Sequence, residues 1–178
     1  SVVEGNAGTD FAVFTVRLST PSSQLVAVLF STTNGTAVAN SDFVPLSGTV
    51  AIPPGGLTGT ISVPIIADTL DEADETFGVL LSDGIGAKVS DNFGIGTILD
   101  DDVPPSITIA NAGVSEGNAG TTIATFVVRL STASGQAVSV DYRTADGTAA
   151  GGSDFTALSG ALRFAAGVLT QTIPVPVR

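Results

Sequence analysis

The residues of this chain with the most capacity for chemistry are carboxylates gathered in two short stretches. Five of them lie between Asp68 and Glu75, and three more are consecutive from Asp100 to Asp102. Carboxylates packed this closely repel one another, so a compact loop holds them favourably only where a cation neutralises them or water solvates them fully. The charge runs alone leave both interpretations open, a cation site and a solvated acidic loop.

Composition limits the kind of ligand chemistry that is available. The 178 residues include 17 Asp and Glu, 6 Lys and Arg, no His and no Cys, which gives a formal net charge of −11. Without His or Cys the chain cannot build an imidazole or thiolate zinc site, a nucleophile paired with a His base, or a disulfide. The acidic balance opposes binding to nucleic acid and to anionic membranes. Oxygen ligation remains, and it favours Ca²⁺ over zinc or copper.

One motif occurs twice, at an offset of 112 residues. Residues 2–9 (VVEGNAGT) match residues 114–121 (VSEGNAGT), and residues 16–20 match residues 128–132 in the same frame. About half of the overlapping positions are identical without a gap, and a period this long indicates whole domains in tandem.

The repeat sets the domain boundaries that we expect. The first domain takes residues 1–102, a short proline linker takes 103–105, and the second domain takes 106–178. The second domain begins with an alternating strand, residues 106–110, that the first lacks, and it ends before any counterpart of residues 68–102. We therefore expect open sheet edges and an uncovered core, to be completed by a partner segment or by a longer native chain.

Short β-rich runs predict an all-β fold. They are separated by Gly, Pro, Ser and Asn clusters at a spacing of roughly ten residues, which is typical of an antiparallel sandwich. In the first repeat the runs are residues 11–18, 24–32, 48–52, 58–66, 75–82 and 93–99. The dipeptides Asn34-Gly35 and Asp146-Gly147 are typical of tight turns with positive φ.

The expected strands predict where the two acidic stretches lie in the fold. If residues 75–82 and 93–99 form a hairpin, the residues before the first strand and after the second emerge at the same pole of the sandwich. Both stretches then meet there. Ca²⁺ takes six to eight oxygen ligands in a loose geometry that loops from one pole can supply.

Several ordered motifs make the chain similar to a known family. Glu4-Gly5, residues 34–43, residues 71–77 (DEADETF) and residues 96–102 (GTILDDD) together resemble the Calx-beta domain, with one nearly complete copy and one truncated copy. The resemblance implies immunoglobulin-like antiparallel β-sandwiches that bind clustered Ca²⁺ at one pole. Calx-beta domains occur in the cytosolic regulatory region of sodium/calcium exchangers and in many extracellular bacterial proteins.

Carried over by position, the resemblance implies metal ligands in both repeats. In the first repeat they are Glu4, Asp42, Asp68, Glu72, Glu75, Asp100, Asp101 and Asp102, and in the second they are Glu116 and Asp154. Because the second repeat lacks the acidic loop and the triplet, we expect it to bind weakly or not at all.

Some of these acids also have purely structural interpretations. Glu4 could cap a turn, and Asp42 could bond local N–H groups in an Asx-turn while Phe43 fills the core. Asp71 and Asp74 are better explained as solvated surface residues. The loop also departs from the family pattern because Asp68 stands alone between Ala67 and Thr69, so we expect fewer ions or weaker binding.

Three functional classes follow from these observations. The first is a calcium-binding structural or adhesive module, in which Ca²⁺ at the pole between domains stiffens a tandem array. Such a module would belong to an extracellular or cell-surface bacterial protein. Its partners would be calcium ions and neighbouring repeats or subunits of the same protein, without nucleic acid or membrane insertion. The alternative is a metal-independent structural or fibre-forming module that assembles by strand complementation at its incomplete ends. An enzyme with paired carboxylates is disfavoured, because the chain has no Trp and one Tyr for binding sugar.

Overall fold

The computed structural model describes all residues from 1 to 178 and contains strands, turns and loops without any helix. It therefore has no helix that could cross a membrane. The all-β prediction is confirmed. The chain divides into two compact units, one of residues 1–69 and 73–102 and the other of residues 70–72 and 103–178.

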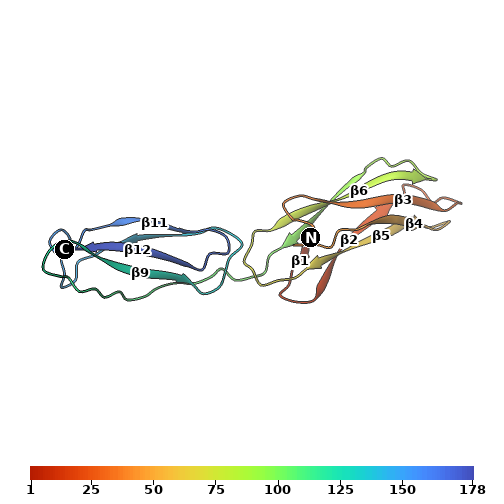
Figure 1. Cartoon of the computed structure of the whole chain (residues 1–178). Helices are drawn as coiled ribbons and strands as arrows, with labels where there is room; N and C mark the ends of the chain where they lie inside the picture. Colours follow the sequence, from red (N-terminus) through yellow and green to blue (C-terminus); the bar gives the residue numbers. More distant parts are fainter. The chain divides into compact units, whose positions relative to one another are not determined.

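The strands of both units follow the runs expected from the sequence (Figure 1). In the first unit they are β1 (Val2–Val3), β2 (Thr9–Arg17), β3 (Val26–Asn34), β4 (Ser47–Ile52), β5 (Thr58–Ile66), β6 (Glu75–Ile85) and β7 (Phe93–Leu99). In the second they are β8 (Ile107–Ile109), β9 (Thr122–Leu130), β10 (Val138–Arg143), β11 (Ser159–Phe164) and β12 (Thr170–Val177).

The first unit packs a five-stranded sheet against a two-stranded one. The larger sheet has the order β1-β7-β6-β3-β4, and the smaller one pairs β2 with β5. The predicted hairpin is confirmed, since β6 and β7 are antiparallel with Glu75 opposite Ile98. The short β1 extends the sheet as a parallel neighbour of β7. The hairpin thus brings the start of β6 and the end of β7 to one pole.

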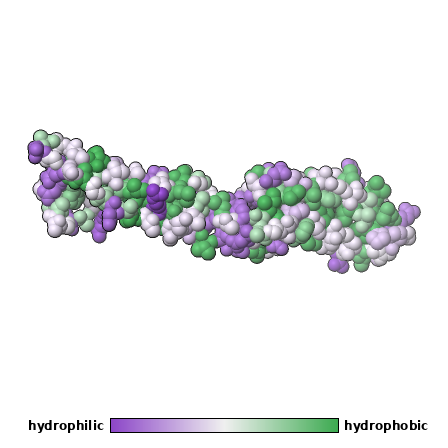
Figure 2. All heavy atoms as spheres, turned by 60° about the horizontal axis from the view of Figure 1, so that its bottom comes forward, coloured by the Kyte–Doolittle hydropathy of each residue, from purple (hydrophilic) through white to green (hydrophobic).

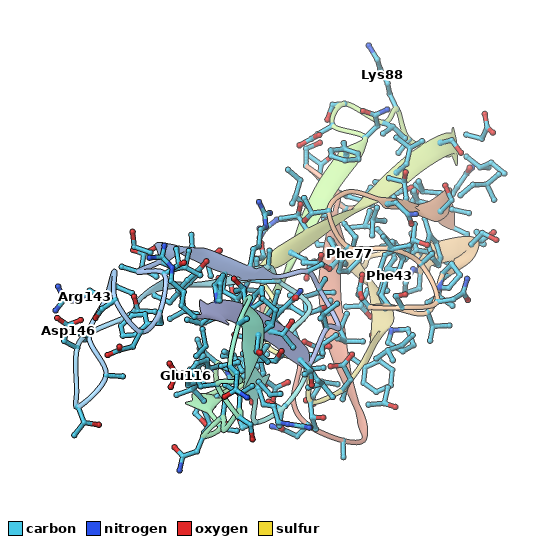
Figure 3. All side chains as sticks on the ribbon, turned by 60° about the vertical axis from the view of Figure 1, so that its left-hand side comes forward. Phe43, Phe77, Lys88, Glu116, Arg143 and Asp146 are labelled. Atoms are coloured by element: carbon cyan, nitrogen blue, oxygen red, sulfur yellow. The ribbon has the colours of Figure 1, made fainter.

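The core of the first unit is built on period-2 alternation. Along β5, Ile61, Val63 and Ile65 are buried while their neighbours are more exposed, as a strand with one buried face requires. Two aromatic rings lie at its centre, where Phe43 stacks on Phe77 with centroids 4.6 Å apart and planes at 20°. Figure 3 shows these two rings next to each other. Offset aromatic pairs of this kind stabilise a core beyond the area that they bury.

The second unit is a sandwich with unpaired edges. Its sheets have the orders β10-β11 and β12-β9-β8. The alternating strand predicted at residues 106–110 is present as β8, antiparallel to β9. Pro174 and Pro176 lie in β12, an edge strand, where a missing N–H costs no ladder hydrogen bond.

The conformation predicted for the Asn34-Gly35 and Asp146-Gly147 turns is wrong. None of these four residues has a positive φ. At Gly35 the reason for glycine is close approach, because a Cβ there would collide with the carbonyl oxygen of Thr76 in β6. At Gly147 a Cβ would meet nothing within 4 Å. The same turn is therefore tightly covered in one unit and open in the other.

Apolar residues also reach the surface of both units. Figure 2 shows green, hydrophobic atoms among white and purple ones on each of them. The exposed large hydrophobic residues include Phe11 and Ile95 in the first unit and Ile109 and Ile123 in the second. Charged residues make up only 13% of the chain, so polar side chains cannot cover all of the surface.

Replacing the central ring tests the core of the first unit. We expect Phe77→Ala to lower the free energy of unfolding of this unit by about 3 to 5 kcal/mol, because a buried ring is lost and leaves a cavity. Urea unfolding followed by far-UV circular dichroism measures the loss. Phe11→Ala is the matched control, since Phe11 is 52% exposed and its removal should change the stability little. Equal losses for the two variants would contradict this account of the core.

The two turn glycines form a second matched pair. Gly35→Ala should destabilise the first unit by about 1 to 3 kcal/mol, because the added methyl group forces the turn and β6 apart. Gly147→Ala should leave the second unit as stable as before, since the added group meets open space. The only tyrosine, Tyr142, lies in the second unit, so its fluorescence follows that unit separately during urea unfolding. A large loss for Gly147→Ala would contradict the assignment.

Candidate metal centre

The acidic loop and the acidic triplet of the first repeat lie together at one pole. The loop precedes β6 and the triplet follows β7, so their positions are fixed by the hairpin that these strands form. A hydrogen bond joins them directly, from the backbone N–H of Asp100 to Oδ1 of Asp74 at 3.2 Å. Asp74 is exposed, as expected for a surface residue, and its carboxylate also accepts this backbone hydrogen bond.

The Glu4-Gly5 turn completes this pole from the N-terminal side. The N–H of Glu4 donates to the carbonyl of Leu99 at 3.0 Å, and the N–H of Gly5 donates to Oδ1 of Asp101 at 2.9 Å. Gly5 has φ +76°, a conformation that favours glycine, which lets the chain turn beside the triplet. Glu4 is only 5% exposed. Burying a carboxylate is costly unless a partner offsets its charge, so this position fits a ligand or a tightly bonded turn residue.

Asp42 fulfils the structural role that the sequence suggested for it. Its Oδ2 accepts a hydrogen bond of 2.5 Å from the N–H of Val38, and the following residue, Phe43, is completely buried in the core. The backbone carbonyl of Asp42 accepts a further bond, from the N–H of Ile66. Asp42 is thereby held rigidly at the pole.

Three carboxylates come close enough to share an ion. Asp42, Glu72 and Glu75 each offer one oxygen, these oxygens all lie within 4.8 Å of one another, and all three residues are half-buried. Ca²⁺ binds oxygen at about 2.3 to 2.6 Å, so two ligands of one ion can be no more than about 4.6 to 5.2 Å apart. The donor set is therefore suitable for Ca²⁺ in both chemistry and spacing.

Four other acids proposed for the first repeat differ in burial. Asp68 and Asp101 are exposed, while Asp100 and Asp102 are half-buried. None of these four belongs to the group of three carboxylates. The structure thus brings together three of the predicted ligands, and backbone hydrogen bonds place Asp100 and Asp101 at the same pole.

One acid of the loop is buried, contrary to the expectation of a solvated residue. Asp71 is 9% exposed, and its Oδ2 accepts a hydrogen bond of 2.7 Å from the hydroxyl of Ser134. Residues 70–72 belong to the second compact unit, as Ser134 does. Ser134 itself is 2% exposed, and its hydroxyl also bonds the carbonyl of Asp71 at 3.2 Å. The sequence gave no signal for this contact, because the two residues are 63 positions apart.

The acids of the second repeat form no comparable group. Glu116 is exposed on a loop, as Figure 3 shows, whereas its counterpart Glu4 is buried. Oδ2 of Asp154 accepts a hydrogen bond of 2.7 Å from the N–H of Ala150, so Asp154 repeats the turn role of Asp42. The structure contains no other group of three acids spaced for a metal.

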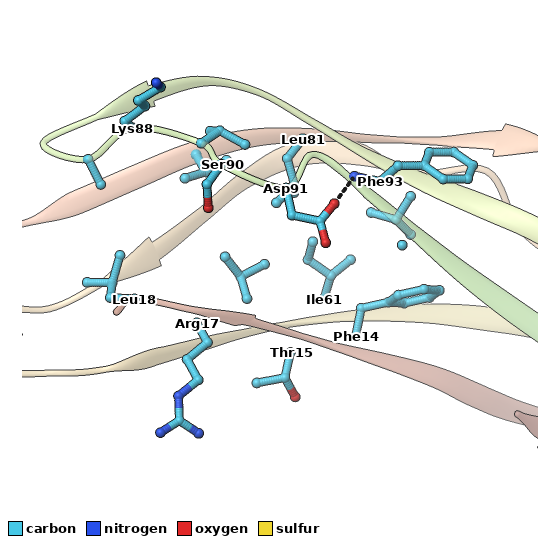
Figure 4. Close-up of a pocket in the computed structure, with 16 residues that line it drawn as sticks. Phe14, Thr15, Arg17, Leu18, Ile61, Leu81, Lys88, Ser90, Asp91 and Phe93 are labelled. Atoms are coloured by element: carbon cyan, nitrogen blue, oxygen red, sulfur yellow. Dashed lines mark hydrogen bonds between the residues drawn. The ribbon is translucent and has the colours of Figure 1, made fainter. Parts of the chain in front are cut away.

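A cavity of about 320 Å³ in the first unit has different chemistry (Figure 4). Its lining mixes apolar residues such as Phe14 and Ile61 with polar and charged ones, and Arg17 and Thr15 point away from Phe14 and Ile61 in the close-up. Asp91 is its only carboxylate, and this group accepts a hydrogen bond of 3.4 Å from the N–H of Phe93. The cavity therefore lacks the pair of carboxylates on which glycoside hydrolysis depends.

Comparison with known proteins gives a consistent family assignment. The model of the Calx-beta domain matches residues 1–97 and again residues 100–178. Sodium/calcium exchanger 1 of Bos taurus is 34% identical over 97% of the chain, and sodium/calcium exchanger 3 of Homo sapiens is 30% identical over 91%. The chain spans 20% of the length of each of these relatives.

Solved structures agree with this result. The crystal structure of CBD12 from CALX1.2 matches 99% of the chain and 70% of its own length, with a TM-score of 0.51 and 25% identity. The structure described as calcium binding domain CBD12 of CALX1.1 matches 98% of the chain and 71% of its own length, with a TM-score of 0.52 and 23% identity, which supports the fold.

These relatives correct the source and location inferred from the sequence. The prediction of an extracellular or cell-surface bacterial protein is wrong, because the curated relatives are sodium/calcium exchangers of mammals. The absence of cysteine, which fits several compartments, could not have decided this point. Two consecutive matches to one family model, which together span almost all residues, show that the chain belongs to the Calx-beta family as a tandem of two domains.

Proposed function

We propose that this chain is a calcium-binding tandem module whose ion site lies at the acidic pole of the first repeat. The observation that carries the proposal is the group formed by Asp42, Glu72 and Glu75, with oxygens within 4.8 Å of one another. A solved structure of similar fold, CBD12 of CALX1.1, is described as a calcium binding domain. Both point to oxygen ligation of Ca²⁺.

The acidic residues at this pole have two roles, as metal ligands and as acceptors of backbone hydrogen bonds. Asp42, Glu72 and Glu75 would hold the ion, and bound Ca²⁺ would supply positive charge that offsets their mutual repulsion. Asp101 and Asp74 accept backbone hydrogen bonds from Gly5 and Asp100 and so fix the surrounding segments. Asp42 keeps its orientation through the bond from Val38. Remaining ligands would come from nearby carboxylates, carbonyls and water.

The effect that we propose for Ca²⁺ is mechanical and regulatory rather than catalytic. An ion at this pole draws the acidic loop toward the strands that flank it, and the triplet leads directly into Val103-Pro104-Pro105, where prolines already restrict the backbone. Binding would therefore stiffen the start of the linker. A structural role in a longer array remains part of this proposal, and adhesion or fibre formation has no support beyond the sequence.

Thermal unfolding in the presence of Ca²⁺ tests the proposal. With dissociation constants of about 10⁻⁴ to 10⁻³ M, about 10 mM Ca²⁺ should stabilise the first repeat by about 1.4 to 2.7 kcal/mol and raise its melting temperature by several degrees. Glu72→Gln with Glu75→Gln should remove most of this rise, because two of the three charged ligands become neutral. Differential scanning calorimetry with and without EDTA measures it.

A matched double variant separates a site from general charge. Asp83→Asn with Asp91→Asn removes two charges near the opposite end of the β6–β7 hairpin, and Asn tolerates the positive φ of Asp83. This variant should keep the full response to Ca²⁺. An equal loss of response in both double variants, or the same rise with Mg²⁺ as with Ca²⁺, would argue for nonspecific screening and against the site.

A further inference from the structure

The turn after β2 in the first unit has a counterpart that holds an acidic segment. At the offset of 112 residues, Ser22 corresponds to Ser134, which lies in the turn after β9. In the second unit the hydroxyl of Ser134 donates to Oδ2 of Asp71 at 2.7 Å. The N–H of Gly135 donates to the carbonyl of Asp71 at 2.9 Å, and residues 71 and 134 form a parallel β-bridge. One serine turn thus binds both the side chain and the backbone of an aspartate.

The same internal hydrogen bonds shape the two turns. Oγ of Ser22 accepts a bond of 3.0 Å from the N–H of Gln24, and Oγ of Ser134 accepts the equivalent bond of 3.1 Å from Gln136. The carbonyl of each serine also accepts a bond from an N–H in the turn before β5 or β12, at 2.8 and 2.9 Å. Because the turn of the first unit is held in the same way, it needs little ordering to bind an aspartate.

The turn of the first unit offers the two donors that the second unit uses. The hydroxyl of Ser22 and the N–H of Ser23 donate to no acceptor in the chain. Their counterparts, on Ser134 and Gly135, are the two groups that hold Asp71. Ser22 is half-buried and Ser23 is exposed, so both donors can be reached by another polypeptide.

A cavity of about 790 Å³ opens beside this turn. Its lining includes Ser22 and Ser23 from the turn, Arg17 from β2, and Lys88 from the loop between β6 and β7. No Asp or Glu belongs to this lining, and Asp91 lines the neighbouring cavity of about 320 Å³ instead. Figure 4 shows Arg17 and Lys88 on the two sides of that neighbouring cavity, which both residues also line. The larger cavity therefore combines hydroxyl groups with positive charge.

The charge at this end of the first repeat is opposite to that of its acidic pole. Arg17 and Lys88 are the only Lys and Arg residues among residues 1–102, which include 13 Asp and Glu. Both side chains are exposed, and Figure 3 shows Lys88 extending outward from its loop. The acidic stretches lie at the other end of the β6–β7 hairpin. A segment with negative charge is therefore attracted to this end, although the repeat as a whole repels it.

One position differs between the two turns and determines which segment fits. A Cβ at Gly135 would collide with the carboxylate of Glu72, the residue that follows Asp71. Ser23 stands at this position in the first unit and carries a Cβ. In the first unit a glutamate directly after the bound aspartate is therefore disfavoured, and alanine or glycine is favoured.

We propose that the Ser22-Ser23 turn and the cavity beside it form a binding site for an acidic segment of another polypeptide, in which an aspartate is followed by a small residue. The hydroxyl of Ser22 donates to the aspartate carboxylate, and the N–H of Ser23 donates to the aspartate carbonyl. Arg17 and Lys88 attract the negative charge of the segment. A hydrogen bond to a carboxylate is stronger than one between neutral groups, so the aspartate side chain supplies both affinity and specificity.

NMR titration of the whole 178-residue chain tests the site. The probe is the acetylated and amidated peptide TLDAA, which has the sequence of residues 69–73 with alanine in place of Glu72. All samples contain EDTA, which separates the outcome from calcium binding. The peptide should shift the backbone amide signals of Ser23 and Gln24 in a saturable way. Shifts confined to the turn of the second unit, or no shift up to the solubility limit of the peptide, would overturn the proposal.

Free anions separate a peptide site from simple anion binding. Sodium acetate and sodium phosphate are titrated at the same concentrations as the peptide. They should shift the amides of Ser23 and Gln24 much less, because they lack the aspartate carbonyl that accepts from Ser23. The peptide TLNAA, with asparagine in place of aspartate, should bind at least about tenfold more weakly than TLDAA, since the charged acceptor is lost. Equal shifts with acetate, or equal affinity for TLNAA, would overturn the proposal.

Variants of the turn locate the contact. Ser22→Ala should weaken binding of TLDAA by about tenfold or more, because a hydrogen bond to a charged group is lost. Ser23→Gly should strengthen binding of TLDEA, the natural sequence of residues 69–73, by about threefold or more, because it restores the space that Gly135 provides. An unfolded variant cannot produce this gain. Unchanged affinity of Ser23→Gly for TLDEA would overturn the proposal.

A matched pair of charge variants tests the role of the two cations. Arg17→Gln with Lys88→Gln should weaken binding of TLDAA at low salt by about threefold or more, because the attraction to the acidic segment is lost. Arg143→Gln with Arg163→Gln removes the same charge from exposed positions of the second unit and should leave the affinity unchanged. Equal losses for the two double variants would show nonspecific attraction and overturn the assigned site.

Discussion

The pairing of β6 with β3 on one side and β7 on the other is the constraint on which the rest of the first repeat depends. It carries Phe77 into the core against Phe43, and it fixes the register in which Glu75 lies opposite Ile98. Because the strand starts at the acidic loop and its partner β7 ends at the triplet, the same pairing that completes the core also assembles the acidic pole. The stability of the first repeat and the assembly of its acidic pole are therefore linked through one strand.

The second repeat shows the same chain without that strand. Its turn, its buried faces and its Asp154 bond repeat those of the first repeat, so local structure does not need the covering strand. What changes is burial. Ala149 and Glu116 are exposed where Ala37 and Glu4 are buried, and no acidic group forms. Comparison of the two repeats thus shows that the local sequence sets the turn hydrogen bonds, whereas the complete sandwich sets the burial of these side chains.

The acidic pole illustrates how such a site balances opposing costs. Carboxylates close together are unfavourable unless something offsets their repulsion, and each half-buried oxygen loses some hydration. Here backbone N–H groups of Gly5, Val38 and Asp100 each bond a carboxylate, which lowers part of that cost and holds the acids in place. An arrangement that is rigid and still rich in negative charge is well prepared for a divalent cation.

The sequence by itself determined the duplication, the strand runs, the β6–β7 hairpin and the meeting of the two acidic stretches, because period-2 alternation, turn residues and charge clusters are local signals. It also named Asp42, Glu72 and Glu75 among a larger set through the family resemblance. Only the tertiary structure selected these three, since the distance between their oxygens depends on loops that no local rule positions. The burial of Asp71 against Ser134 and the steric reason for Gly35 were likewise decided in three dimensions. Both depend on contacts between residues far apart in the chain, where packing, rather than the preference of any short segment, sets the environment of each side chain.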